Sequence, residues 1–159
     1  LGFSKSFGTF SDVSGSFTLD EKAPENSKVD VTIGMDSVVT GIPKFDAHLK
    51  SKDFFDVEAH PKAVFKSSKI EQTGEKTAKI HGELTMLGKT HPLVLDATLN
   101  KVGVNGFSKA NTAGFSLKGS IDRSQYGMDY GVPGIPATVD LMIEAEGVKQ
   151  TANPADAKK

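Results

Sequence analysis

The sequence predicts an all-β fold, an antiparallel up-and-down β-barrel with one short helix. The first observation is the alternation of apolar and polar residues along most of the chain, which is typical of strands with one buried face. The second is that short turn-like segments join many of these runs, such as residues 22–27, 73–76 and 87–90. Evenly spaced strands without crossover helices favour a sandwich or an up-and-down barrel.

Seven segments are the predicted strands: residues 13–19, 28–37, 62–71, 77–86, 92–102, 112–122 and 137–148. A closed barrel of lipocalin size uses about eight strands. Residues 3–10 could supply only part of another strand. We therefore expect a barrel that is one strand short.

Residues 43–56 break the alternation. Pro43 suits the start of a helix, and Phe45 and Leu49 fall on one helical face. We expect a short helix here, followed by a turn that contains Phe54 and Phe55. Residues 1–148 are predicted to form a single domain, and the polar, alanine-rich residues 149–159 a flexible tail.

Composition excludes several classes of partner and site. The net charge is −1 and the charges are interspersed, which gives no argument for a nucleic-acid partner. The absence of cysteine excludes disulfides and thiolate metal sites. No apolar run approaches the roughly 20 residues of a membrane helix, so we expect no stable membrane insertion.

The sequence contains no recognisable catalytic motif. The four histidines form neither an HxH nor an HExxH pair, and no GxSxG or phosphate-binding glycine loop occurs. A loose acidic cluster lacks the spacing of a calcium loop: Asp46, Asp53, Asp56 and Glu58. We therefore predict no catalytic residues, no metal site, no cofactor and no enzyme activity.

Four glycines occupy the core-facing positions of predicted strands: Gly15, Gly82, Gly119 and Gly147. A barrel of this size can pack its interior or hold one small ligand. Glycines on the inner face could leave room for such a ligand. They could equally allow the strands to coil and bend. Both interpretations stay open at this point.

Three segments resemble a known family. They are MDSVVT (35–40) running into FDAHLKSKDFFD (45–56), then PKAVFKS (61–67) with GELTMLGKTHPL (82–93), and finally IDRSQYGM (121–128). On these residues the chain resembles the YceI family, bacterial proteins with an extended lipocalin fold that bind polyisoprenoids or other long-chain lipids. The matching segments span nearly the whole chain in the family's order.

The resemblance carries expectations about the start of the chain and its location. Family members usually begin with a strand that runs into a His-x-Gly-like segment, whereas this chain opens at Leu1-Gly2-Phe3-Ser4. We therefore expect a lipocalin-like barrel with its first strand missing. The unpaired edge would be open to strand exchange or homodimer formation. The family's signal peptides imply secretion to the periplasm by a leader upstream of this chain.

The resemblance also implies a ligand, namely a polyisoprenoid, an isoprenoid quinone or a fatty-acid derivative. Its tail would lie inside the barrel against Phe17, Ile33, Phe65, Leu84, Leu95, Phe115, Leu117 and Leu141. The helix and the phenylalanine-rich turn would line or cap the mouth through Phe45, Leu49, Phe54 and Phe55. Arg123 or Asp46 would contact a polar headgroup. The alternative for Arg123 is a salt bridge that fixes the helix to the barrel.

Two other functions compete with lipid binding. A stress-related structural or interaction barrel would have a packed core and no ligand. An isoprenoid-modifying enzyme would need polar groups that converge inside the barrel, and the inward rows contain almost none. The enzyme is therefore the least favoured of the three.

Overall fold

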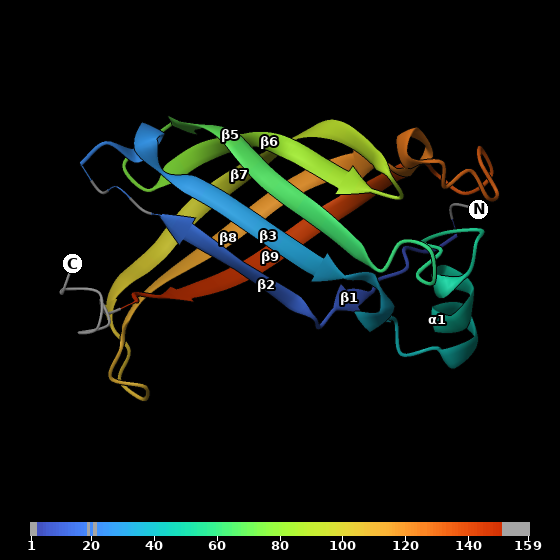
Figure 1. The fold of residues 1–159 in the computed structure, drawn as a ribbon, viewed down its shortest axis with the longest axis horizontal. Coiled ribbons are helices and arrows are strands. Elements are labelled where there is room, and N and C mark those ends of the chain that lie inside the picture. Colours follow the sequence, from blue (N-terminus) through green and yellow to red (C-terminus); the bar gives the residue numbers. More distant parts are fainter. Residues whose placement is uncertain (1–2, 19, 21, 151–159) are drawn as a thin grey trace, which may run out of the picture.

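The structure is a computed structural model that describes residues 3–18, 20 and 22–150. Its main feature is a seven-stranded antiparallel sheet that curls into a barrel-like shell (Figure 1). Each strand pairs with its sequence neighbours in this sheet, so the predicted up-and-down topology is confirmed. The strands are β2 (Val13–Thr18), β3 (Lys28–Gly34), β5 (Lys62–Gln72), β6 (Thr77–Met86), β7 (Lys89–Val104), β8 (Asn111–Asp122) and β9 (Thr138–Val148).

The predicted helix is present as α1 (Pro43–Lys50), with Pro43 in its first turn. A separate two-stranded sheet pairs β1 (Thr9–Phe10) with β4 (Val38–Val39). Short 3-10 helices occur at η1 (Pro24–Asn26), η2 (Met35–Ser37) and η3 (Arg123–Tyr126). Among the described residues, no helix is both long and apolar enough to cross a membrane.

The strand predicted over residues 28–37 ends earlier than expected. β3 stops at Gly34, and residues 35–37 form η2 instead. The Ser37 hydroxyl donates to the carbonyl oxygen of Gly34 at 2.7 Å, a local bond that competes with continued strand pairing. The turn sends the chain into β4 and then α1.

The sheet is open, because β2 and β9 are its two edges and are not paired with each other. Side chains close part of this gap near the ends of the two strands. The Phe17 ring of β2 meets the Phe115 ring edge to face, with centroids 5.2 Å apart. It also lies so close to Gly147 of β9 that a Cβ atom there would overlap the ring.

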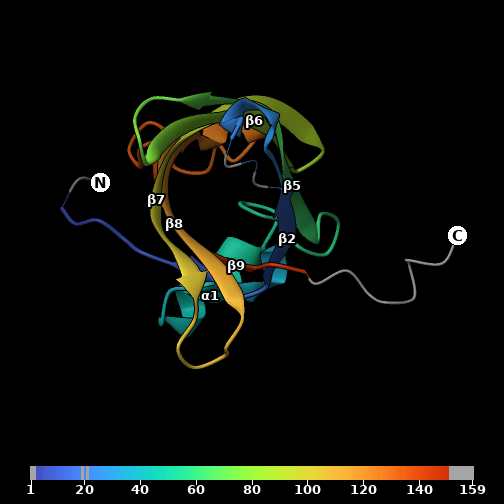
Figure 2. The ribbon, with the colours of Figure 1, turned by 90° about the vertical axis from the view of Figure 1, so that its left-hand side faces the viewer.

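The two ends of the barrel differ. One end carries α1, the β1–β4 sheet, η3 and residues 127–137, and we call it the capped end (right in Figure 1). The other end carries the connections β2–β3, β5–β6 and β7–β8, and we call it the open end. Figure 2 shows the molecule from the open end, with α1 behind the ring of strands.

The buried core extends toward the open end as far as Ile70, Ile80 and Ala97, but most of it lies in the half of the barrel next to the capped end, which we call the packed half. Its side chains come from β5, β6, β7 and the segments that cap this end: Met35, Phe65, Leu84, Met86, Leu93, Tyr126 and Met128. Phe65 covers Gly82 on the neighbouring strand so closely that a Cβ atom at Gly82 would overlap its ring. This glycine therefore makes room for a ring instead of leaving space.

A cavity in the open half as the candidate functional site

A cavity of about 600 Å³ occupies the half of the barrel next to the open end. Every strand of the seven-stranded sheet contributes to its wall. The wall is mainly apolar, and its larger side chains are Phe17, Val29, Val31, Ile70, Ile80, Leu99, Val102, Phe115 and Leu117. They reach one space because alternate residues of each strand face the inside of the curled sheet.

The cavity is bordered by polar residues at the open end and along the two sheet edges. The β5–β6 turn contributes Glu75 and Lys76, and the end of β9 contributes Glu144 and Glu146. All four residues are exposed to solvent. The Glu144 carboxylate accepts a hydrogen bond from the Ser116 hydroxyl, which does not line the cavity. At the turn the border therefore has one carboxylate and one ammonium group, while the wall behind it is apolar.

Phe17, Phe115 and Leu117 are the predicted ligand-binding residues that line this cavity. The other five predicted tail contacts do not line it. Phe65, Leu84 and Leu95 are buried in the core, and Ile33 and Leu141 pack against that core. Alternation placed all eight on the inner face, but the position along the barrel decides which of them meet open space.

The structure places the predicted mouth residues at the capped end, away from the cavity. These residues are Phe45, Asp46, Leu49, Phe54 and Phe55. Helix α1 lies between β4 and β5, and Gly34 at the end of β3 pairs with Lys62 at the start of β5. Topology thus keeps the helix and the turn at this end, where Phe54 and Phe55 pack against the core.

The Asp46 carboxylate is hydrogen-bonded to Thr40, in the segment just before α1. It accepts a hydrogen bond from the backbone N–H of Thr40 at 2.7 Å and another from the Thr40 hydroxyl. These bonds tie the first turn of α1 to the end of the β1–β4 sheet. The carboxylate is therefore part of the capped end.

Arg123 is 4% exposed and holds together the loop that follows η3. Its Nε donates to the carbonyl oxygen of Pro136 at 3.1 Å, and one Nη donates to those of Tyr130 and Ile135. The other Nη donates to the carbonyl oxygen of Met128. Four backbone acceptors are thus satisfied by a single guanidinium, which offers five N–H donors in a planar fork.

Aromatic side chains surround this arginine. The Phe54 ring centroid lies 5.7 Å from the Arg123 guanidinium carbon, within cation–π range. The His48 ring meets Phe54 and Tyr130 edge to face, and its Nε2 lies 2.8 Å from a carboxylate oxygen of Asp53. Within the described residues Arg123 forms no ion pair with a carboxylate, so the predicted alternative of a salt bridge to the helix is wrong.

Two titratable groups near this loop have shifted pKa values. Burial raises the pKa of the Tyr126 hydroxyl, because the phenolate would be poorly solvated there. Hydrogen bonds from the hydroxyl and backbone N–H of Ser124 lower the pKa of the Asp122 carboxyl, which caps η3. The described part of the chain contains no group of three or more His, Cys, Asp or Glu side chains placed to hold a metal ion.

The sequence interpretation missed several cavity residues: Val29, Val31, Ile70, Ile80 and Leu99. For Val29, Val31, Ile80 and Leu99 a signal existed, because they share the inward alternation of their strands. The polar border gave no such signal. Turn residues such as Glu75 and Lys76 have no periodicity that would assign them to a cavity.

Together these features define a curled, up-and-down β-barrel protein with an apolar internal cavity that opens at one end. The profile of the YceI-like domain matches residues 1–147. The chain belongs to the YceI-like family.

Relatives and solved structures agree with this assignment. A UPF0312 protein of Pseudomonas savastanoi pv. phaseolicola is 39% identical over 160 residues, which cover 94% of this chain and 77% of the relative. A UPF0312 protein of Photorhabdus laumondii is 38% identical over 150 residues with the same coverage. The names of these relatives state neither a ligand nor a catalytic activity.

Two crystal structures share the fold. The YceI protein of Campylobacter jejuni superposes with a TM-score of 0.85 at 32% identity, covering 95% of this chain and 89% of its own. BcnA of Burkholderia cenocepacia has a TM-score of 0.79 at 23% identity, covering 88% and 86% of the two chains. The second likeness is one of fold alone.

Proposed function

We propose that this protein binds one long-chain apolar lipid, with the lipid tail inside the cavity of the open half. The observation that carries the proposal is a space of about 600 Å³ whose wall is mainly aliphatic and aromatic. Pockets for small ligands commonly measure about 300–1,000 Å³ and combine an apolar wall with a few polar groups. The cavity fits both criteria.

Burial of the tail would provide the driving force. At about 0.8 kcal/mol per methylene, ten methylenes would contribute roughly 8 kcal/mol before the entropic costs of binding. Phe17 and Phe115 form one wall of the cavity and are already in contact with each other. The ligand would therefore meet a wall that is largely formed before it binds.

The polar border argues for an uncharged headgroup. The opposite charges of Glu75 and Lys76 offset each other, so the turn offers no excess positive charge to a carboxylate or phosphate. An isoprenoid alcohol or a quinone fits this border better than a fatty-acid anion. The headgroup contact predicted for Arg123 or Asp46 stays a prediction, and both residues lie outside the cavity wall.

The test is native mass spectrometry of the purified protein, followed by organic extraction and identification of any lipid. Ala97 faces the cavity and its neighbour Thr98 faces solvent, so Ala97→Phe and Thr98→Phe add the same ring to opposite faces of β7. We expect a stoichiometric adduct of a few hundred daltons, about 0.5 kDa or less for a ligand whose tail fits this volume. The adduct should persist in Thr98→Phe and be lost in Ala97→Phe.

The opposite result would remove the proposal. A bare mass after incubation with farnesol, a quinone and palmitate would favour a structural or interaction barrel without a ligand. An adduct retained equally by both variants would place the lipid elsewhere. With the lipid present, the proposed role is its sequestration or transport without catalysis.

Two expectations about context remain part of the proposal. One is the periplasmic location that the resemblance to the family implied. The other is homodimer formation, which the unpaired edges of β2 and β9 support, since free strand edges can pair with another chain.

A further inference from the structure

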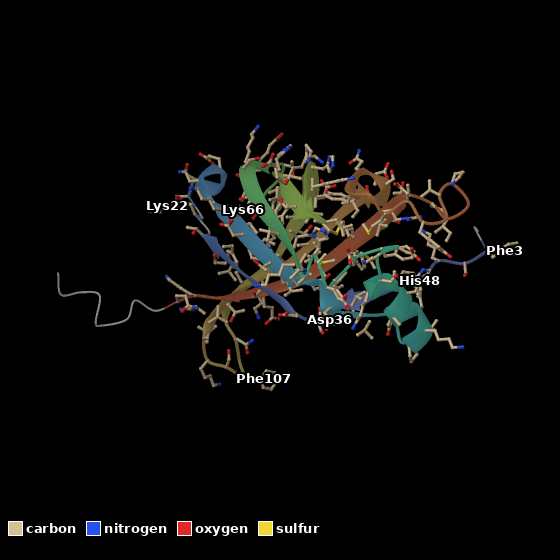
Figure 3. All side chains as sticks on the ribbon, turned by 45° about the vertical axis from the view of Figure 1, so that its right-hand side comes forward. Phe3, Lys22, Asp36, His48, Lys66 and Phe107 are labelled. Atoms are coloured by element: carbon tan, nitrogen blue, oxygen red, sulfur yellow. The ribbon has the colours of Figure 1, made fainter. Side chains whose placement is uncertain are left out.

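The β7–β8 hairpin projects from the open end with an apolar residue at its tip. Phe107 is 100% exposed and Val104, at the base of the loop, is 61% exposed. Figure 3 shows the Phe107 side chain pointing away from the rest of the molecule. A fully exposed phenylalanine at a loop tip gains nothing in the isolated protein, since its ring remains in water.

We propose that this hairpin docks the protein onto a lipid bilayer, with Phe107 inserted among the acyl chains. The inference rests on the proposed lipid-binding function, because it gives the cavity access to the membrane in which an apolar lipid resides. The occupant of this surface is thus a lipid surface, not a second protein.

Continuity between the hairpin and the cavity supports the inference. Leu99 and Val102 line the cavity, and they stand on β7 immediately before the loop that carries Phe107. On the returning strand, Phe115 lines the cavity as well. A bilayer that receives the hairpin tip would therefore lie beside the open end of the cavity.

The charge of the hairpin fits a lipid surface. Residues 99–117 contain Lys101 and Lys109 and no Asp or Glu. The nearest carboxylates across the β8–β9 pairing belong to Glu146 and Glu144, opposite Gly114 and Ser116. Gly114 lies three residues behind the last hairpin pair, Val104–Asn111. Both carboxylates belong to residues that line a hollow together with Lys101 and Phe107. Within the hairpin, the charge that favours an anionic lipid surface is therefore that of Lys109 in its loop.

The absence of tryptophan provides a clean reporter, since a single Phe→Trp substitution gives the only indole in the protein. Phe107→Trp reports on the hairpin. Phe3→Trp is the matched control, because Phe3 is 96% exposed and lies near the capped end (Figure 3). Both substitutions replace exposed rings, so neither disturbs the core.

The experiment adds vesicles of phosphatidylcholine with and without phosphatidylglycerol to each variant and records tryptophan emission. We expect the Phe107→Trp emission to shift to the blue and to be quenched by brominated acyl chains, more strongly with phosphatidylglycerol. The Phe3→Trp emission should stay unchanged. In sedimentation with the same vesicles, Phe107→Ser should bind at least about tenfold more weakly than Phe3→Ser, the effect of removing one buried aromatic side chain.

Several results would overturn the proposal. These are an unshifted Phe107→Trp spectrum, equal shifts at both sites, or a blue shift without vesicles that grows with protein concentration and reveals a contact between copies. Native mass spectrometry tests the lipid-binding function independently of this vesicle experiment, because it detects lipid in the cavity without a membrane. A lipid adduct without vesicle binding would overturn the docking surface alone. Vesicle binding without an adduct would overturn the cavity function and leave the docking surface standing.

Discussion

The two halves of the barrel interior are built by the same strands but are filled differently. In the packed half, Phe65 and Leu84 are buried, and Tyr126 of η3 is only 2% exposed. In the open half, Phe17 and Phe115 remain partly exposed beside a cavity of about 600 Å³. The comparison shows that the segments at the two ends of the barrel, more than the strands, determine which half of the interior is filled by side chains.

The capped end supplies side chains that no strand of the main sheet could supply. Met35 comes from η2, Phe55 from the turn after α1 and Tyr126 from η3, and all three pack in the core. The open end carries the β2–β3 connection with η1, the β5–β6 turn and the β7–β8 hairpin, whose apolar tip points outward. Nothing comparable enters the interior from that side among the described residues.

The largest expected effect compares one residue type in both halves. Phe65→Ala should lower the free energy of unfolding by about 3–5 kcal/mol, because it opens a hole in a close-packed region. Phe115→Ala should cost about 1–2 kcal/mol, since its ring already borders open space and removes less surface from water. Urea denaturation of both variants measures the difference, and equal losses would contradict a hollow half.

The next effect concerns the capped end. Arg123→Lys should cost about 2–3 kcal/mol, because an ammonium group cannot reach four carbonyl oxygens that a planar guanidinium satisfies. The measurement is again urea denaturation, together with lipid content by native mass spectrometry. If the arginine contacts a headgroup, the lysine variant loses lipid affinity as well as stability; unchanged affinity would remove that prediction.

A smaller effect compares two glycines that face aromatic rings. A Cβ atom at Gly82 would overlap both the Phe65 ring and the backbone oxygen of Lys66, so Gly82→Ala should cost about 1–3 kcal/mol. At Gly147 the overlap is with Phe17 alone, whose ring can turn into the cavity. Gly147→Ala should therefore cost less than about 1 kcal/mol. Thermal unfolding of the pair checks the order, which a reversed ranking would refute.

The smallest effect is a pH dependence at the capped end. Because the pKa of the Asp122 carboxyl is lowered in the folded protein, its stabilising effect is complete above the ordinary value of about 3.9. The effect is lost as the pH falls through the lowered pKa. Asp122→Asn caps η3 without titrating, so the melting temperatures of this variant and the wild type should converge from pH 6 to pH 2. A constant difference would show that this carboxyl does not contribute.

Alternation predicted most of the fold, because period two directly reports which face of a strand is buried. The seven predicted strands correspond to the seven strands of the main sheet, and residues 43–56 contain α1. The residues beyond 150, where the flexible tail was predicted, lie outside the described part of the chain. The local turn at η2 was missed, since a serine–carbonyl bond leaves no periodic trace.

The cavity was less predictable than the fold. Alternation assigned Phe17, Phe65 and Phe115 to the inner face of the sheet. Only the contacts across the barrel determine which of these rings lies in the core and which borders the cavity. Phe17 covers Gly147, which is 130 positions away in the chain, and no local pattern encodes that pairing. The hydrogen-bond partners of Arg123 are backbone carbonyl groups. Every residue has such a group, so the sequence does not indicate which of them the guanidinium will bind.

The central claim is that a lipid tail enters one half of the interior and leaves the other unchanged. Methyl NMR during titration with farnesol tests it directly. We predict that the signals of Val29, Val31, Ile70, Leu99 and Leu117 shift together, while those of Leu84, Met86 and Leu93 stay in place. Shifts spread evenly over both groups, or no shifts at all, would contradict the account.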